Sequence, residues 1–373
     1  METREQPEIR FEIHLSGHPL PDAERTQVMA APGFGSVFTD HMVTLRWAGE
    51  RGWHDGRLEP YGPITLDPAS SVLHYGQEIF EGLKAYAQDN GEVRTFRPYA
   101  NAARLNRSAQ RMAMPALPEQ AFVDAIDTLL AHDRAWVPAA PDMALYIRPF
   151  IIATQRGLGV NRPSDSYQFT VIASPVGGYF TGGVRPVTVW LSREYTRAAP
   201  GGTGEAKCGG NYAAAFAGQE EAVRNDCDQV VWLDSAEHRW VEEMGGMNLF
   251  FVYGSGAGAR IVTPALTGTL LPGVTRDSLL TLGPDLGIPA DEGRISVDDW
   301  QDGCASGEIT EVFACGTAAV VTPVGRLLWD GGEAPSATGD EEGGELTMRI
   351  RQELVDIQFG RAEDTFGWMH RVV

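Results

Sequence analysis

The chain has 373 residues, of which 43% are hydrophobic and 21% charged, as expected for a globular protein of about two domains. Its formal net charge of −20 argues against nucleic acid and anionic membranes as partners, because both select for basic patches. The chain contains no run of eighteen apolar residues, so we expect no membrane span. The polar N-terminus lacks the apolar core of a secretory signal. The four cysteines show no CxxC spacing, so we expect a cytoplasmic protein without a metal site.

Predicted elements of the first half follow a polar, Pro- and Gly-punctuated segment, residues 1–35, which we expect to be an extended arm. Alternating or continuous apolar residues predict strands over 42–47, 93–96, 144–153 and 167–174. Helical spacing of apolar residues predicts helices over 99–112 and 119–133. Lys84 falls in a further strand-like stretch.

A Pro- and Gly-rich break over 175–183 predicts a domain boundary, with a first domain over 1–178, a linker over 179–185 and a second domain over 186–373. In the second domain we expect strands over 187–191, 229–233, 240–242, 247–253, 311–314 and 319–323. Helices are predicted over 213–224, 275–282, 298–305 and 345–357. The low-complexity segment 330–344 is expected to be mobile. The pattern predicts an α+β fold with a site in the cleft between the domains.

Lys207 lies in an unusual setting for a chain whose only other lysine is Lys84. It is surrounded by glycines in the stretch Gly201-Gly202-Thr203-Gly204-Glu205-Ala206-Lys207-Cys208-Gly209-Gly210. Glycines let the backbone approach a ligand closely, and a lysine amine can attack a carbonyl carbon to form a Schiff base. A solvated lysine on a surface loop is the alternative that this stretch alone leaves open.

Four further segments carry candidate site residues. Glu243 precedes a Gly-Gly turn, and the stretch 270–277 runs through Pro-Gly into a helix start, where backbone N–H groups favour anions. A hydroxyl follows a glycine at Gly316-Thr317, and Arg104 and Arg107 follow Phe96-Arg97-Pro98. Each segment by itself also fits an ordinary turn, cap or surface pair.

In this order, these segments resemble the branched-chain amino-acid aminotransferases, which are pyridoxal 5′-phosphate (PLP) enzymes of fold type IV. The resemblance runs from Gly33-Phe34-Gly35 to Gly367-Trp368-Met369, and is densest over Leu73–Tyr86, over Leu145–Pro149 and around Lys207. It implies a two-domain α+β fold of that type and PLP as the cofactor.

The resemblance also implies roles at the cofactor. Lys207 would form the Schiff base and carry the proton between Cα of the substrate and C4′ of the cofactor. Glu243 would face the pyridine nitrogen and keep it protonated, and Tyr212 would form a hydrogen bond with the phenolic oxygen of the cofactor. The phosphate would be held by Arg104, the backbone of Val274 and Thr275, and the hydroxyl of Thr317. Lys84 lacks the glycine loop and the neighbouring anion site.

For the substrate, Tyr75 and Arg148 match the polar end of the family's pocket, which also admits the side-chain carboxylate of glutamate. Phe80 and Tyr146 resemble its apolar walls, although core packing is an alternative for both. The backbone at Gly246 and Ala318 matches positions that bind the α-carboxylate. Some relatives have threonine in place of Gly246, and a redox CxxC where this chain has Ala319 and Thr322.

The implied reaction is a ping-pong transamination of L-leucine, L-isoleucine and L-valine with 2-oxoglutarate, which gives the 2-oxo acids and L-glutamate. D-amino-acid aminotransferase and aminodeoxychorismate lyase are the alternatives within the same fold, because the same lysine and glutamate would serve them. A cofactor-binding protein without catalysis is the alternative from another class. The family also implies a homodimer in which the loop 156–160 lies near the partner's site.

Overall fold

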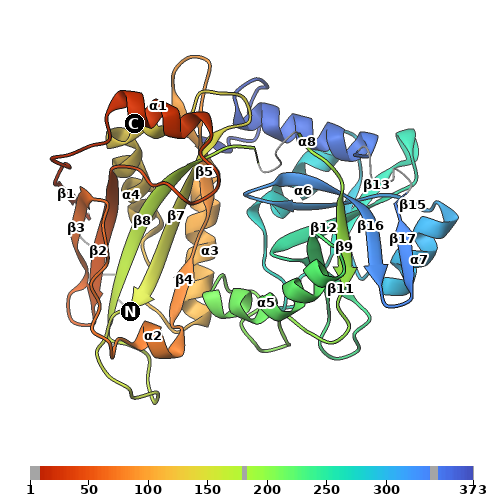
Figure 1. Ribbon diagram of the computed structural model, residues 1–373, viewed down its shortest axis with the longest axis horizontal. Coiled ribbons are helices and arrows are strands. Elements are labelled where there is room, and N and C mark those ends of the chain that lie inside the picture. The colour runs from red at the N-terminus through yellow and green to blue at the C-terminus, as the bar shows by residue number, and fades with distance from the viewer. Residues whose placement is uncertain (1–8, 179–182, 337–342, 373) are drawn as a thin grey trace. The chain divides into compact units, whose positions relative to one another are not determined.

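The computed structural model describes residues 9–178, 183–336 and 343–372, and it divides into two compact units (Figure 1). Unit 1 comprises Met1–Gly177, Gln358–Gly360 and Asp364–Val373. Unit 2 comprises Gly178–Ile357 and Arg361–Glu363.

Unit 1 is built on one mixed sheet with helices on it. Its strands are β1 (Phe11–Ile13), β2 (His41–Ala48), β3 (Gly52–Pro60), β4 (Glu78–Phe80), β5 (Leu83–Ala87), β6 (Val93–Phe96), β7 (Ala144–Ala153), β8 (Ser166–Val176) and β18 (Met369–Arg371). Its helices are α1 (Asp22–Ala30), α2 (Ser71–Tyr75), α3 (Pro98–Arg111), α4 (Glu119–His132) and the 3-10 turn η1 (Arg134–Trp136).

Within the described residues, the strand order of this sheet is β1-β3-β2-β8-β7-β5-β6-β18, and β4 pairs with β7. Strand β7 alternates buried and half-buried residues, so one face of the sheet packs on the core while the other carries Tyr146 and Arg148. Helix α4 buries residues one turn apart, including Phe122, Ile126 and Leu129, and it packs against β2 and β8.

Unit 2 contains a second mixed sheet. Its strands are β9 (Val187–Leu191), β10 (Gln229–Leu233), β11 (Val241–Met244), β12 (Met247–Tyr253), β13 (Arg260–Pro264), β14 (Ala290–Gly293), β15 (Ile309–Gly316), β16 (Val320–Trp329) and β17 (Gly332–Pro335). Its helices are α5 (Gly209–Arg224), α6 (Val274–Asp285), α7 (Val297–Ser306), α8 (Glu345–Gln358) and the 3-10 turn η2 (Gly256–Gly258).

The strand order in unit 2 is β11-β10-β9-β16-β15-β12-β13-β14, and β11 also pairs with β12, so the sheet closes on itself. The closed sheet encloses an apolar core that includes Val231, Leu249 and Phe251, all of which are fully buried. Helix α5 packs on β9 and β10, and α7 packs on β15 and β17. A capping box between Ser296 and Asp299 begins α7.

Most predicted elements are present, and β9, β10 and β12 have the predicted bounds. The expectation of an extended arm over 1–35 is wrong for part of its length, because β1 and α1 form there. Helix α1 buries none of its residues, so no apolar period marked it. The mobile segment expected over 330–344 is also partly wrong: β17 pairs with β16. Residues 337–342 lie outside the described residues.

The C-terminus departs from the expected domain bounds. We expected 186–373 to form the second domain, yet Asp364–Val373 groups with unit 1 because β18 pairs antiparallel with β6. A three-residue strand at the end of a chain shows no local pattern that identifies its partner. Residues 1–8 of the expected first domain and 179–182 of the expected linker lie outside the described residues.

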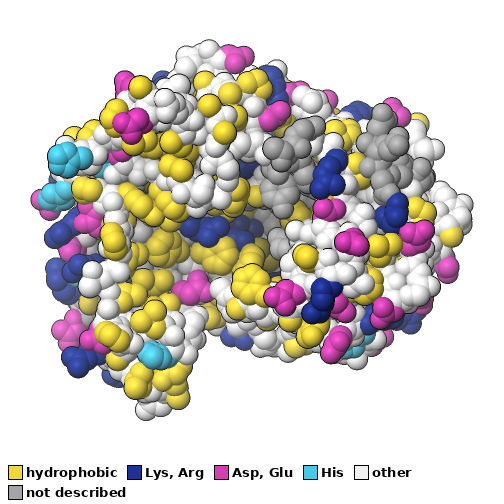
Figure 2. Space-filling view, in the orientation of Figure 1, with side chains coloured by type: hydrophobic (Ala, Val, Ile, Leu, Met, Phe, Trp, Pro, Cys, Tyr) yellow, Lys and Arg dark blue, Asp and Glu magenta, His cyan; other side chains and the backbone are white. Residues whose placement is uncertain are grey.

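Charged side chains of both signs lie on the surface. Acidic and basic side chains are interspersed over the visible face of unit 2 (Figure 2), so the negative charge is not collected in one patch there. None of the helices formed by the described residues is long and apolar enough to cross a membrane.

Candidate active site

The side chain of Asn211 bonds the glycine loop that carries Lys207 at several points. Asn211, in the first turn of α5, donates from its amide to the carbonyl oxygens of Thr203 and Ala206, both at 2.7 Å. Its amide oxygen accepts from the hydroxyl of Thr203, also at 2.7 Å. A Cβ on the buried Gly204 would overlap the backbone of Thr269, so only glycine allows the loop to pack this closely.

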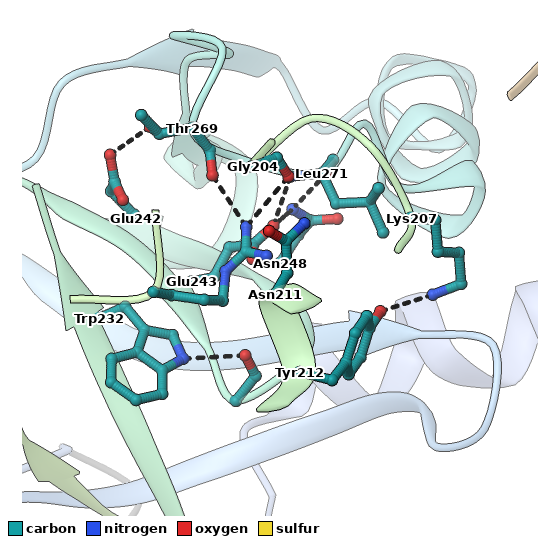
Figure 3. Close-up of polar contacts among 12 residues, drawn as sticks. Gly204, Lys207, Asn211, Tyr212, Trp232, Glu242, Glu243, Asn248, Thr269 and Leu271 are labelled. Atoms are coloured by element: carbon teal, nitrogen blue, oxygen red, sulfur yellow. Dashed lines mark hydrogen bonds and ion pairs between the residues drawn. The ribbon is translucent and has the colours of Figure 1, made fainter. Parts of the chain in front are cut away.

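Lys207 and Tyr212 point toward each other across the start of α5 (Figure 3). The amine Nζ of Lys207 donates to the hydroxyl of Tyr212 at 2.7 Å. A Cβ on Gly246 would lie only 3.3 Å from Cε1 of Tyr212, so a larger side chain at 246 would press on this ring. The sequence had paired these residues only through a family resemblance, and the structure brings them into contact.

Glu243 is a buried carboxylate on β11 with several donors around it. Its Oε2 lies 2.6 Å from the guanidinium of Arg197. Its Oε1 accepts from the backbone N–H of Leu271 at 2.7 Å and from the amide of Asn248 at 3.3 Å. Figure 3 shows Glu243 among Asn248 and Leu271, so β11, β12 and the segment before α6 all converge on one carboxyl group.

The environment of Glu243 acts on its pKa in two directions. Burial raises the pKa of this carboxyl, and the charge of Arg197, the N–H of Leu271 and the amine of Lys207 oppose that effect. On the other face of β11, burial likewise raises the pKa of Glu242, whose carboxyl accepts from the hydroxyl of Thr269. The two neighbouring carboxyls therefore differ in their partners: among the described residues, a guanidinium contacts Glu243 and none contacts Glu242.

Two turns and a helix start meet at the same edge of the unit 2 sheet. Asn248 of β12 is the register partner of Cys315 of β15, so the turn at Gly245-Gly246 lies next to the turn at Gly316-Thr317-Ala318. Asn248 also donates to the carbonyl oxygen of Leu271 at 3.1 Å. The start of α6 at Val274 and Thr275 is thereby tied to the same edge, and α6 begins without a side-chain cap.

The turn after β15 carries backbone strain. Val320 has a φ of 63°, a conformation that β-branched residues rarely adopt. Arg351 of α8 donates to the carbonyl oxygens on either side of it, those of Ala319 at 2.9 Å and Val321 at 3.1 Å. Strained residues persist where their surroundings hold them, and here an arginine holds the turn that contains Thr317 and Ala318.

A cavity of about 350 Å³ opens on these groups. It is lined by Arg197, Tyr212, Phe216, Glu243, Gly246 and Leu271 among others, and we call it the Glu243 pocket. A phenol and a buried carboxylate line this cavity, and the amine of Lys207 contacts the phenol. Together these groups suit a ring that bears a carbonyl carbon, a hydroxyl and a basic nitrogen. These donors and acceptors fit the pyridine ring of PLP.

In unit 1 the structure brings together three of the expected substrate residues. Arg148 of β7 stacks its guanidinium 4.7 Å from the ring centre of Phe80 and 5.4 Å from that of Tyr146. It also donates to the hydroxyl of Tyr146 at 3.1 Å. Its Nε is buried and has no hydrogen-bond partner among the described residues, so this guanidinium is only partly satisfied. We call these three residues the Arg148 cluster.

Arg104 of α3 is linked to this cluster through Glu81, which directly follows Phe80 in the chain. Its guanidinium forms two parallel bonds of 2.8 Å with the carboxylate of Glu81. Both side chains are buried, and Asn101 donates to the same carboxylate at 2.7 Å. The expected phosphate ligand is therefore held in a fixed orientation by an anion that the sequence analysis did not single out.

Tyr75, expected at the polar end of the substrate pocket, lies in α2, and its hydroxyl donates to the carbonyl oxygen of Leu158 at 2.6 Å. It lines a cavity of about 680 Å³ in unit 1 together with the segment 155–164. Lys84 is buried in β5 opposite Tyr146, in a strand and not in a glycine loop.

Four residues that hold the site were not identified from the sequence: Arg197, Asn211, Asn248 and Arg351. Arg197 is one arginine among many, ten positions before Lys207, and nothing local distinguishes it. Asn211 directly follows the glycine stretch and Asn248 follows the Gly-Gly turn by two residues, so an amide close to glycines was the only sequence signal. Arg351 lies far along the chain from the turn it holds.

The comparison with protein families gives a direct match. The model of the family described as amino-transferase class IV matches residues 78–327, more than half of the chain. The matched range contains Lys207, Tyr212 and Glu243 together with the Arg148 cluster.

Relatives are similar over nearly their whole length. The chain is 57% identical over 361 residues to a probable branched-chain-amino-acid aminotransferase of Streptomyces coelicolor, covering 96% of this chain and 98% of that protein. It is 56% identical over 365 residues to the branched-chain-amino-acid aminotransferase of Mycolicibacterium smegmatis, covering 98% of each.

Solved structures agree with the sequence matches. The branched-chain amino acid aminotransferase of Escherichia coli superposes with a TM-score of 0.72 at 28% identity, over 88% of this chain and 99% of that one. The T.th. branched-chain amino acid aminotransferase with pyridoxamine 5′-phosphate gives a TM-score of 0.71 at 28% identity, over 88% and 98%. With the family model, the close relatives and the fold in agreement, this chain belongs to the class IV aminotransferases, and to their branched-chain amino-acid branch.

Proposed function

We propose that the chain uses PLP to transfer the amino group of L-leucine, L-isoleucine or L-valine to 2-oxoglutarate. The observation that carries this proposal is the 2.7 Å contact between the amine of Lys207 and the hydroxyl of Tyr212 beside the pocket that contains Glu243. PLP, when bound, supplies an electron sink for the charge that develops at the substrate's Cα. The protein must hold the ring, orient the substrate and move one proton.

Lys207 is the residue that moves the proton in this proposal. Its Nζ would take the proton from Cα of the substrate and deliver it to C4′ of the cofactor, which requires a neutral amine for part of the cycle. The hydroxyl of Tyr212 holds Nζ in place, and the loop behind it is fixed by Asn211. These contacts hold the flexible side chain of Lys207 in one position.

Glu243 would hold the proton on the pyridine nitrogen. Three donors orient its carboxyl group, and its side chain is only 3% exposed. A carboxylate in such a site interacts strongly with a cationic ring because little water screens the pair. The protonated ring is the better electron sink.

The phosphate would lie at the start of α6, against the backbone of Val274 and Thr275, with the hydroxyl of Thr317 and the guanidinium of Arg104. The helix N-terminus offers N–H groups and a favourable dipole to a dianion. Arg104 belongs to unit 1 and the other groups to unit 2.

For the substrate, the Arg148 cluster supports the double specificity of the reaction. Phe80 and Tyr146 offer apolar surface to an aliphatic side chain, and Arg148 has hydrogen-bonding capacity left for the side-chain carboxylate of glutamate. The backbone at Gly246 and Ala318 would receive the α-carboxylate, and Tyr75 would complete the polar end. One methylene changes binding by only about 1–3 kcal/mol, so all three branched-chain amino acids should react.

A cytoplasmic homodimer is the assembly that we propose. Leu158 and Val160, in the loop 156–160, are 63% and 73% exposed, which is unusual for apolar side chains and suits a subunit contact. Sedimentation of the purified chain tests the assembly independently of the reaction.

The reaction is tested by the absorption spectrum of the chain reconstituted with PLP. L-leucine should remove the visible band of the bound cofactor, and 2-oxoglutarate should restore it. A band that ignores L-leucine and responds to D-alanine would contradict the proposal, and so would a chain that acquires no band with added PLP.

A further inference from the structure

Arg197 is the cation nearest to Glu243 among the described residues, and it is almost completely buried. Its side chain is 7% exposed, and its terminal NH2 nitrogen lies 2.6 Å from Oε2 of Glu243. The same nitrogen donates to the carbonyl oxygen of Thr269 at 2.8 Å and lies 3.4 Å from that of Gly204. These carbonyls fix the guanidinium on the side of Glu243 that faces the Lys207 loop.

The contacts of Glu243 suit a carboxylate and not a carboxylic acid. Within the described part of the chain, its two oxygens meet N–H donors from Arg197, Leu271 and Asn248. A carboxyl proton would have to compete with these donors for the same lone pairs. Burial acts in the opposite direction and raises the pKa of this carboxyl, and the charge of Arg197 is the largest of the effects that oppose burial.

The position of Arg197 also bears on where a shared proton would lie. A carboxyl group and a pyridine nitrogen that share one proton have two arrangements: acid with neutral ring, or carboxylate with cationic ring. Moving the proton from the carboxyl to the ring moves positive charge away from Arg197 and leaves a carboxylate beside it. Both changes lower the electrostatic energy in a buried site.

We propose that Arg197 is a positioning residue that keeps Glu243 ionised and thereby keeps the proton on the ring nitrogen of bound PLP. The inference rests on the proposed function, in which PLP binds in the Glu243 pocket. Arg197 touches Glu243 and the backbone, and it acts on the cofactor through Glu243. Its effect should therefore appear in the protonation of the ring before it appears in the binding of substrate.

The test is the nitrogen NMR signal of PLP labelled with 15N in its ring and bound to the full chain at neutral pH. The wild type should give the signal of a protonated pyridine. Arg197→Gln should move it toward the position of an unprotonated ring, and Arg197→Lys, which retains a cation, should keep most of the wild-type shift. In steady-state kinetics, Arg197→Gln should lose kcat by on the order of tenfold while KM changes little.

Thr269→Val is the matched control. It removes a buried hydroxyl that bonds Glu242, but it leaves the backbone carbonyl that accepts from Arg197. Its ring signal should equal that of the wild type. A similar signal change in Thr269→Val and Arg197→Gln would show general loosening of the pocket and overturn the inference.

The outcomes separate this inference from the proposed function. An unchanged ring signal in Arg197→Gln would assign Arg197 a bracing role only and overturn the inference. If Arg197→Gln does not retain PLP, Arg197→Lys decides, because loss of the ring proton despite a retained cation would also overturn the inference. If the wild type binds no PLP, the proposed function itself fails.

Discussion

The Glu243 pocket of unit 2 and the Arg148 cluster of unit 1 differ in the partners that surround their charged groups. In the pocket, the carboxylate of Glu243 has Arg197 at 2.6 Å and two further donors, so its charge is matched and its orientation fixed. In the cluster, Arg148 stacks on two aromatic rings, and no carboxylate among the described residues pairs with it. The difference corresponds to two kinds of ligand.

A cofactor that stays bound through the cycle is best served by groups whose positions and charges are set in advance. A substrate site that must admit both an aliphatic side chain and a carboxylate is better served by a cation that aromatic rings can cover. Cation–π contacts satisfy a guanidinium only in part, and they leave N–H groups for an arriving anion.

The largest effect is expected for Lys207→Ala. Without the amine, transamination should fall by at least on the order of 10⁴-fold, and borohydride should no longer attach the cofactor covalently to the chain. The control is Lys84→Arg, which retains a cation in β5 and should keep both properties. Should Lys84→Arg abolish attachment while Lys207→Ala keeps it, the assignment of the pocket is wrong.

Glu243→Gln is expected to have the next largest effect. The amide keeps the size of the side chain but cannot hold a proton on the ring nitrogen, so kcat should fall roughly 10²- to 10³-fold while PLP is retained. PLP content and kcat, measured on the same preparation, check this. Near-normal turnover in this variant would remove the carboxylate from the mechanism and reduce unit 2's pocket to a binding site.

Arg148→Gln should act on only one of the two substrates. Loss of charged hydrogen bonds costs about 1.5–3 kcal/mol, so kcat/KM for 2-oxoglutarate should fall roughly 10- to 150-fold. The half-reaction with L-leucine should change much less. Tyr146→Phe, which removes only the hydroxyl that accepts from Arg148, should give a smaller effect in the same direction. Equal losses for both substrates would contradict the role of the cluster.

The smallest effect is expected for Glu242→Gln, and it concerns stability. Burial raises the pKa of the Glu242 carboxyl, so the folded chain binds this proton more tightly than the unfolded chain. This carboxyl therefore lowers the free energy of unfolding as pH rises above the ordinary pKa of a glutamate. The variant lacks this loss, so its stability relative to the wild type should increase between about pH 4 and pH 7.

Thermal unfolding of both proteins across this pH range checks the prediction. Glu220→Gln, on the exposed face of α5, serves as the control and should show no such trend. A relative stability of Glu242→Gln that is flat or falls with pH would mean that burial does not control this group.

Local sequence determined the parts of this protein whose signal is carried by neighbours along the chain. Apolar runs predicted β9, β10 and β12, because a strand buried on both faces consists of consecutive apolar residues. The glycines around Lys207, the Gly-Gly turn after Glu243 and the Pro-Gly before α6 marked the site, because close backbone approach needs particular residues at particular positions. Resemblance to a family then gave these residues their roles.

Only the tertiary structure decided which groups meet. The pairing of Arg197 with Glu243, of Arg104 with Glu81, and of Arg148 with Phe80 joins residues that no local pattern connects. The return of β18 to the first sheet and the hold of Arg351 on the strained turn at Val320 are of the same kind. Such contacts join chain segments that meet only after folding. Because a buried charge without a partner is costly, these charged groups are stable only where folding brings a suitable partner to them.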